Sequence, residues 1–172
     1  MEQMIVVVMG VSGSGKTTIG ELLAKRSGAV FADADDYHPA ANKEKMSAGH
    51  PLNDEDRKPW LETLNRLMLV WYQEGGSGVL ACSALKQSYR DTLAHGIPAE
   101  GIRFVWLDLS PEMISKRLAS RHHEFMNPDL LQSQINTLEP PADALRIVND
   151  ATPDEVVSRI LTQLPATAEA KS

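Results

Sequence analysis

The amino-acid sequence predicts an α/β domain built on a parallel sheet, and three observations carry that prediction. Short apolar runs alternate with helical segments along the chain. A glycine-rich loop joins the first apolar run, residues 4–9, directly to a helical segment. The length of 172 residues, with 42% hydrophobic content, suits one compact unit. We therefore expect one domain over residues 1–164 and a loose tail over 165–172.

The predicted strands are apolar on both faces, as expected for a buried parallel sheet. They cover residues 4–9, 29–32, 78–82, 103–107 and 145–148. Between them, Pro39 and Gly49 bound one helix, and Asn53 or Asp54 caps a longer one. The remaining helices open at 110–111 (Ser-Pro), 127–128 (Asn-Pro) and the capping box 152–155 (Thr-Pro-Asp-Glu).

The glycine-rich loop reads G-V-S-G-S-G-K-T over residues 10–17 and satisfies the phosphate-loop pattern G-x-x-x-x-G-K-[ST]. Its glycines let main-chain N–H groups turn inward around phosphate oxygens, and the helix start adds partial positive charge. Lys16 is placed to reach the β- and γ-phosphates, and the Thr17 hydroxyl to ligate Mg²⁺. The alternative is a chance glycine-rich turn between a strand and a helix. The predicted ATP-binding residues are Gly10, Ser12, Gly13, Ser14, Gly15, Lys16, Thr17 and Thr18.

Composition argues against several classes of partner. A net charge of −6 disfavours nucleic acid and anionic membrane surfaces, because both require a basic footprint. No run approaches the roughly 18 apolar residues of a membrane helix, and no secretory segment precedes the phosphate loop. Cys82 is the single cysteine and is expected to be a buried thiol. A cytoplasmic protein is the expectation.

The phosphate loop alone does not choose among GTPases, motor ATPases and small-molecule kinases. The GTPase motifs D-x-x-G and N-K-x-D are missing from the sequence. Asp108 follows an apolar strand as a Walker B acid would, but we favour its being the polar end of a buried strand.

A better acidic cluster, D-A-D-D-Y-H over residues 33–38, directly follows the second strand. Ligands of open parallel sheets bind beyond the carboxyl ends of the strands, so these acids are expected near the γ-phosphate. Asp33 and Asp35 alternate along an extended segment and could project to one side. A carboxylate near the metal and another near an acceptor hydroxyl suit phosphoryl transfer to an alcohol. The alternative is a solvated acidic loop.

Two groups of cations follow. Arg57 and Lys58 stand near a helix start, where the helix dipole disfavours cations, which suggests an anionic ligand. Surface pairing with the aspartates of the same segment is the alternative. Lys86 and Arg90 are four residues apart, so we expect them on one helical face, where they could hold a ligand carboxylate or hydroxyls.

Together these motifs closely resemble the gluconokinases, small ATP:gluconate 6-phosphotransferases. The resemblance covers residues 4–164 and rests on the phosphate loop and four further motifs. These are D-A-D-D-Y-H-P (33–39), N-K-E-K-M (42–46), G-H-P-L-N-D-E-D-R-K-P-W-L (49–61) and C-S-A-L-K-Q-S-Y-R-D (82–91). A related shikimate kinase should carry a glycine-rich segment where this chain has C-S-A-L.

The resemblance implies a three-layer P-loop NTPase fold with a five-stranded parallel sheet of order 2-3-1-4-5. It also implies a mobile lid at about 118–128, Mg-ATP as donor, D-gluconate phosphorylated on its 6-hydroxyl, and a possible homodimer. Lid arginines of such kinases close on the phosphates, and Arg117 and Arg121 are the matching candidates for compensating transition-state charge.

The resulting hypothesis assigns Lys16 to the phosphates, Thr17 to Mg²⁺, Asp33 to a metal-bound water and Asp35 to the attacking hydroxyl. The candidate substrate-binding residues are Asp35, His38, Arg57, Lys86 and Arg90. A structural role is the alternative for His38. The loop 149–152 is a candidate adenine contact. Two other functions stay open: a kinase for shikimate, another sugar acid or a nucleotide, and a nucleotide-binding regulatory module without turnover.

Overall fold

The computed structural model describes residues 4–11, 13–50, 52–120 and 128–169. Its strands form one sheet in the order β2-β3-β1-β4-β5, and every neighbouring pair is parallel, which confirms the predicted order. The strands are β1 (Ile5–Met9), β2 (Val30–Asp33), β3 (Gly78–Ala81), β4 (Ile102–Asp108) and β5 (Leu145–Val148).

The helices fall close to their predicted positions. They are α1 (Lys16–Ser27), α2 (Ala40–Ser47), α3 (Asp54–Gln73), α4 (Gln87–Ala94), α5 (Pro111–Ser120), α6 (Pro128–Thr137) and α7 (Pro153–Glu169), with 3-10 turns η1 (Ala34–Tyr37) and η2 (Ala99–Gly101). Asn53 caps α3 in a capping box with Asp56. At α7 one half of the predicted box is present: the Glu155 main-chain N–H donates to the Thr152 hydroxyl at 3.3 Å, and that hydroxyl donates to the Glu155 carboxylate at 2.8 Å.

The helix α7 continues to Glu169, into the segment 165–172 for which a loose tail was expected, and the looseness of that segment stays a prediction. Ala166, Ala168 and Glu169 have high helix propensity, so the small polar composition that suggested a tail is also compatible with further helical turns.

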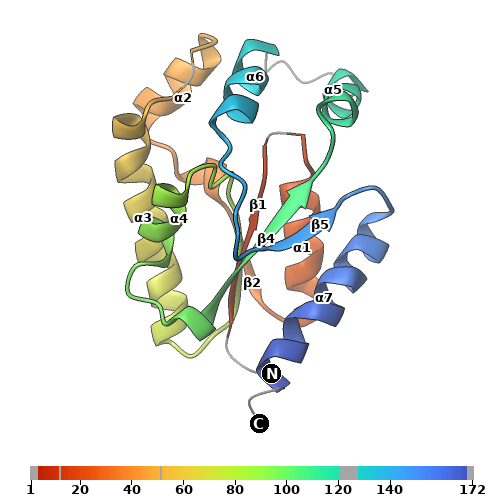
Figure 1. The fold of residues 1–172 in the computed structure, drawn as a ribbon. Helices are drawn as coiled ribbons and strands as arrows, with labels where there is room; N and C mark the ends of the chain where they lie inside the picture. The colour runs from red at the N-terminus through yellow and green to blue at the C-terminus, as the bar shows by residue number, and fades with distance from the viewer. Residues whose placement is uncertain (1–3, 12, 51, 121–127, 170–172) are drawn as a thin grey trace.

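Helices cover both faces of the sheet, with α3 and α4 on one side and α1 and α7 on the other (Figure 1). The central strand β1 contributes side chains to the hydrophobic clusters on both faces of the sheet, because successive side chains of a strand point to opposite faces. Val7 and Met9 join the cluster under α3 and α4, whereas Val6 and Val8 join the cluster under α1 and α7. All four side chains are buried, which explains why this strand is a continuous apolar run.

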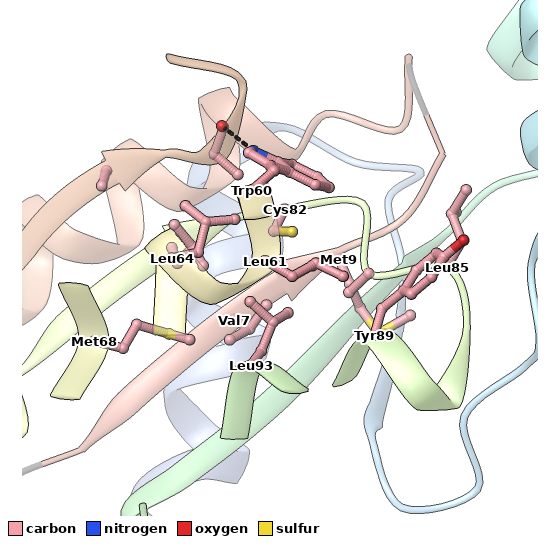
Figure 2. Close-up of a cluster of buried hydrophobic side chains, with 14 of the residues drawn as sticks. Val7, Met9, Trp60, Leu61, Leu64, Met68, Cys82, Leu85, Tyr89 and Leu93 are labelled. Atoms are coloured by element: carbon pink, nitrogen blue, oxygen red, sulfur yellow. Dashed lines mark hydrogen bonds between the residues drawn. The ribbon is translucent and has the colours of Figure 1, made fainter. Parts of the chain in front are cut away.

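Figure 2 shows the first of these clusters, where side chains from β1 and α3 meet those of α4. Leu64, Met68 and Leu93 are fully buried there, and Trp60 is only 2% exposed. Cys82 lies in the same cluster, as predicted, and burial raises the pKa of its thiol to about 12. This layer therefore fixes α3 and α4 against the sheet, and both helices carry candidate site residues.

The end of the molecule beyond the carboxyl ends of the strands is where α2, α5 and α6 gather (Figure 1). The phosphate loop after β1 and the acidic turn η1 after β2 emerge at this end. No helix in the described ranges is long and apolar enough to cross a membrane.

Candidate active site

The phosphate loop adopts a backbone that only glycine accommodates easily. Gly10, Gly13 and Gly15 have φ angles of 151°, 84° and 99°. A Cβ on Gly10 would lie 2.7 Å from the Ser14 Oγ and 2.9 Å from the Leu107 main-chain oxygen. Gly15 is the N-cap of α1, so the free N–H groups of that helix face the loop. This geometry fits the phosphates of a nucleotide; Ser12 lies outside the described residues.

Side chains at the start of α1 connect the loop to the acidic turn. The Thr17 hydroxyl donates to Asp33 Oδ2 at 2.7 Å, and the Asp35 main-chain N–H donates to Asp33 Oδ1 at 3.0 Å. Lys16 Nζ donates to the Val11 main-chain oxygen at 3.2 Å. Thr17 and Asp33 thus place a hydroxyl and a carboxylate side by side, and such hard oxygen donors fit Mg²⁺.

Asp35 has an altered acidity. Its surface is open to solvent, yet enough protein surrounds the carboxylate that lost hydration raises its pKa above the ordinary value. Lys16 opposes this effect, whereas Asp33 and Asp36 add to it through like-charge repulsion. The structure therefore brings Lys16, Asp33 and Asp35 together at one electrostatically coupled site.

His38 lies behind the acidic turn. It is 8% exposed and stacks on Trp60, with ring centroids 4.0 Å apart. Burial, with Arg57 and Lys43 nearby, lowers the pKa of His38 to about 4, so its imidazole is neutral at physiological pH. Asn42 Nδ2 lies 3.2 Å from Nδ1 of His38 and donates to it when that nitrogen carries no proton. These contacts are structural, and direct contact of His38 with a substrate stays a prediction.

Trp60 is a core residue that also fixes the acidic turn. Its Nε1 donates to the Ala34 main-chain oxygen at 2.7 Å, the dashed line in Figure 2. Ala34 stands between Asp33 and Asp35, so the core under α3 helps to set the position of both carboxylates. Sequence reasoning missed this second role because an indole donor leaves no periodic signal.

The cations near the acceptor side form a network centred on Tyr89. Arg57 Nη1 donates to the Tyr89 hydroxyl at 2.9 Å, and that hydroxyl donates to Asp54. Lys86 Nζ donates to both carboxylate oxygens of Asp54, at 3.0 and 3.2 Å. Arg57 and Lys86 also lie over the Tyr89 ring, 5.3 and 5.6 Å from its centroid. Sequence reasoning found both cations and missed the tyrosine and the aspartate that join them.

The aspartates at the start of α3 form ion pairs, but with lysines of other segments and not with Arg57. Asp54 pairs with Lys86 and Asp56 pairs with Lys45, both across elements. Hydrogen bonding by Tyr89 and Lys86 lowers the pKa of Asp54, and bonding by Lys45 and Asn53 lowers that of Asp56. Arg57 bonds to Tyr89 instead of an aspartate of its own segment.

The expectation that Lys86 and Arg90 share a helical face was wrong. Lys86 is the N-cap of α4 and has extended backbone angles, so the helical spacing rule does not apply to it. The guanidinium of Arg90 donates instead to the main-chain oxygens of Ala84 and Glu139, at 2.7 and 2.8 Å, and Arg90 is 3% exposed. These contacts place Arg90 behind the loop that carries Lys86.

Asp108 is the polar end of a strand, as favoured, and pairs with Arg146 at 2.6 Å. The predicted lid falls mostly on residues that the structure does not describe. Arg121 is one of those residues, and only the backbone of Arg117 is described. In the loop proposed for adenine, Asn149 is buried and its Nδ2 donates to the Ser14 main-chain oxygen at 2.7 Å.

Comparison with known proteins gives consistent relatives. A family model described as "Shikimate kinase" matches residues 12–165. A probable gluconokinase of Xenopus tropicalis is 46% identical over 98% of this chain and 95% of its own length. The thermosensitive gluconokinase of Escherichia coli is 49% identical over 83% of this chain and 75% of its own.

Solved structures also include a gluconokinase among the similar proteins. A gluconokinase from Sinorhizobium meliloti has a TM-score of 0.87 at 39% identity, covering 97% of this chain and 94% of its own. An APS kinase from Mycobacterium tuberculosis has a TM-score of 0.68 at 21% identity, covering 95% and 98%, and shares the P-loop kinase fold. The chain therefore belongs to the gluconokinase family, within the P-loop kinases that the shikimate kinase family model describes.

Proposed function

We propose that this protein transfers the γ-phosphoryl group of ATP to the 6-hydroxyl of D-gluconate, giving 6-phospho-D-gluconate. The observation that carries the proposal is the meeting of a phosphate loop with an acidic turn, joined by the hydrogen bond between Thr17 and Asp33. The gluconokinase names of relatives at 42–49% identity support the acceptor.

On the donor side, the main-chain N–H groups of the loop and Lys16 hold the β- and γ-phosphates. Thr17 and, through water, Asp33 are placed to hold Mg²⁺, which neutralises charge on the phosphates when bound. Arg117 and Arg121 are the proposed source of further positive charge as the phosphoryl group moves.

On the acceptor side, Asp35 accepts a hydrogen bond from the attacking hydroxyl and takes its proton late in the transfer. A raised pKa makes this carboxylate a stronger base than an ordinary aspartate. Gluconate has its carboxylate at the opposite end from the 6-hydroxyl, so its site requires a base at one end and cations at the other. Arg57 and Lys86, held by Tyr89 and Asp54, are the proposed carboxylate partners.

Further parts of the proposal are a cytoplasmic location, a homodimer as the family resemblance implies, and contact of His38 with the substrate. Arg90, a candidate substrate ligand in the sequence, is proposed to support the site by holding the loop before α4. A kinase for shikimate or another small acceptor is the second candidate, and the family model described as "Shikimate kinase" favours keeping it.

An ADP-release assay with Mg-ATP and a panel of acceptors tests the proposal. The panel contains D-gluconate, L-idonate, shikimate, adenylylsulfate and nucleoside monophosphates. We expect strong turnover with gluconate alone. Turnover with another acceptor would keep the phosphoryl-transfer mechanism and reject Arg57 and Lys86 as gluconate ligands. Absence of ADP release with every acceptor would favour a nucleotide-binding module without turnover.

A further inference from the structure

Glu139, two residues beyond the end of α6, makes three separate hydrogen bonds to the loop before α4 and to α4 itself. Its main-chain N–H donates to the Leu85 oxygen at 2.8 Å, and its main-chain oxygen accepts from Arg90 Nη2 at 2.8 Å. Its side-chain Oε1 accepts from the Gln87 main-chain N–H at 2.9 Å. One residue from a distant part of the chain thus contacts both sides of Lys86, which is a proposed gluconate ligand.

The side-chain bond completes a helix terminus. Gln87 is the first residue of α4, and the N-cap residue Lys86 makes no side-chain capping bond. A helix start leaves its first N–H groups without partners inside the helix, and a carboxylate there also complements the helix dipole. Glu139 supplies that acceptor from 52 residues away, because the ammonium of Lys86 only donates and is bonded to Asp54.

The loop before α4 requires such support because its backbone is strained. Ala84 has a φ of 46°, the one non-glycine residue with positive φ in the described chain. A conformation of this kind costs of order 1 kcal/mol and persists only where neighbouring contacts impose it. Arg90 Nη1 holds the Ala84 main-chain oxygen at 2.7 Å, and the same guanidinium binds the Glu139 oxygen.

We propose that Glu139 is a positioning residue of the acceptor site. Its carboxylate fixes the first turn of α4, and its main chain fixes the strained loop, so that Lys86 and Tyr89 face Asp54 and Arg57 in a geometry ready for the acceptor carboxylate. Glu139 itself touches no substrate. This inference rests on the proposed function, since it concerns binding of the same acceptor.

Steady-state kinetics of the full chain test the side-chain part of the proposal. Replacing the side chain, Glu139→Ala, should raise KM for gluconate roughly tenfold, because a lost cap of this type is worth about 1 kcal/mol or slightly more. KM for ATP and kcat should change less than about twofold by the same reasoning. Glu139→Gln, whose amide oxygen still accepts from Gln87, should return KM close to wild type. The matched control is Glu62→Ala, at an exposed glutamate of α3.

Hydrogen exchange at the Gln87 amide gives a second readout that requires no acceptor. It should be slow in wild type and in Glu139→Gln, and faster in Glu139→Ala. An unchanged KM for gluconate in Glu139→Ala, or an equal rise in both KM values, would overturn the proposal. Unchanged exchange would also overturn it. Absence of any turnover of wild type with gluconate would instead reject the proposed function, while faster exchange in Glu139→Ala would still support the cap.

Discussion

The carboxylate of Asp35 combines a raised pKa with a position beside Lys16 and Asp33, and this pairing suits a base that acts on an alcohol next to a phosphate. Replacing it, Asp35→Ala, should lower turnover with gluconate by at least about 10²-fold, the usual size of a general-base effect. Circular dichroism and thermal unfolding should stay near wild type, because the side chain is at a solvent-open turn. Unchanged turnover would remove Asp35 from this role.

The pH dependence of the reaction follows from the raised pKa of Asp35. Asp35 must be ionised to act as a base, so kcat/KM should fall as the pH drops through its raised pKa, at a higher pH than for an ordinary aspartate. Asp36 contributes repulsion that raises this pKa, so Asp36→Asn should move the acid limb of the profile to lower pH. A limb that stays in place or moves upward would show that Asp35 does not set it.

His38 links acidity to stability. Its pKa is about 4 in the folded chain and near 6.5 in an unfolded one, so the unfolded state gains a proton first as the pH falls. The folded state should therefore lose stability between pH 6.5 and about 4, and keep it above pH 6.5. In urea unfolding, His38→Gln should lose less stability than wild type over this interval. Equal losses in both proteins would contradict this account.

At the scale of elements, α3 and α4 meet through Tyr89, whose hydroxyl accepts from Arg57 and donates to Asp54. Tyr89→Phe keeps the ring in the core and removes this bridge. Losing bonds of this kind costs about 1 kcal/mol, so KM for gluconate should rise roughly fivefold while KM for ATP stays constant. Tyr72→Phe is the matched control, because Tyr72 lies against Gly101, near the start of β4 and far from the site. Equal effects of the two substitutions would argue against a role in acceptor binding.

At the scale of the whole molecule, the sequence was sufficient for those features that local chemistry determines. Continuous apolar runs located the strands, and the glycine pattern with Lys16 located the loop whose glycines have positive φ angles. The acidic turn was found because it directly follows a strand. The sheet order itself came from the family resemblance, since strand order depends on contacts between distant segments.

The site contacts that sequence reasoning missed share one physical cause, which is dependence on such distant contacts. Tyr89, Glu139 and Asn149 act through hydrogen bonds across 32 to 135 residues, and no spacing rule encodes them. Lys86 was misplaced for a related reason, because the helix it was assigned to begins one residue later, where Glu139 supplies the cap.

Asn149 provides the longest of these connections, across 135 residues. It joins the loop after β5 to the phosphate loop through the Ser14 main-chain oxygen, and it is 4% exposed. Asn149→Ala should cost about 1 to 3 kcal/mol of unfolding free energy, the penalty for a buried acceptor that loses its partner. Because the lost bond holds the phosphate loop, KM for ATP should also rise several-fold while KM for gluconate changes little.

Asn65 offers a control of the same chemistry elsewhere in the fold. It is 8% exposed and donates to the main-chain oxygens of Leu93 and His95 at 2.7 and 2.9 Å. Asn65→Ala should therefore lose comparable stability in urea unfolding without raising KM for ATP. If both variants raise KM for ATP equally, the effect comes from general loosening of the fold. If only Asn149→Ala raises it, the loop after β5 holds the phosphate loop in the conformation that binds nucleotide.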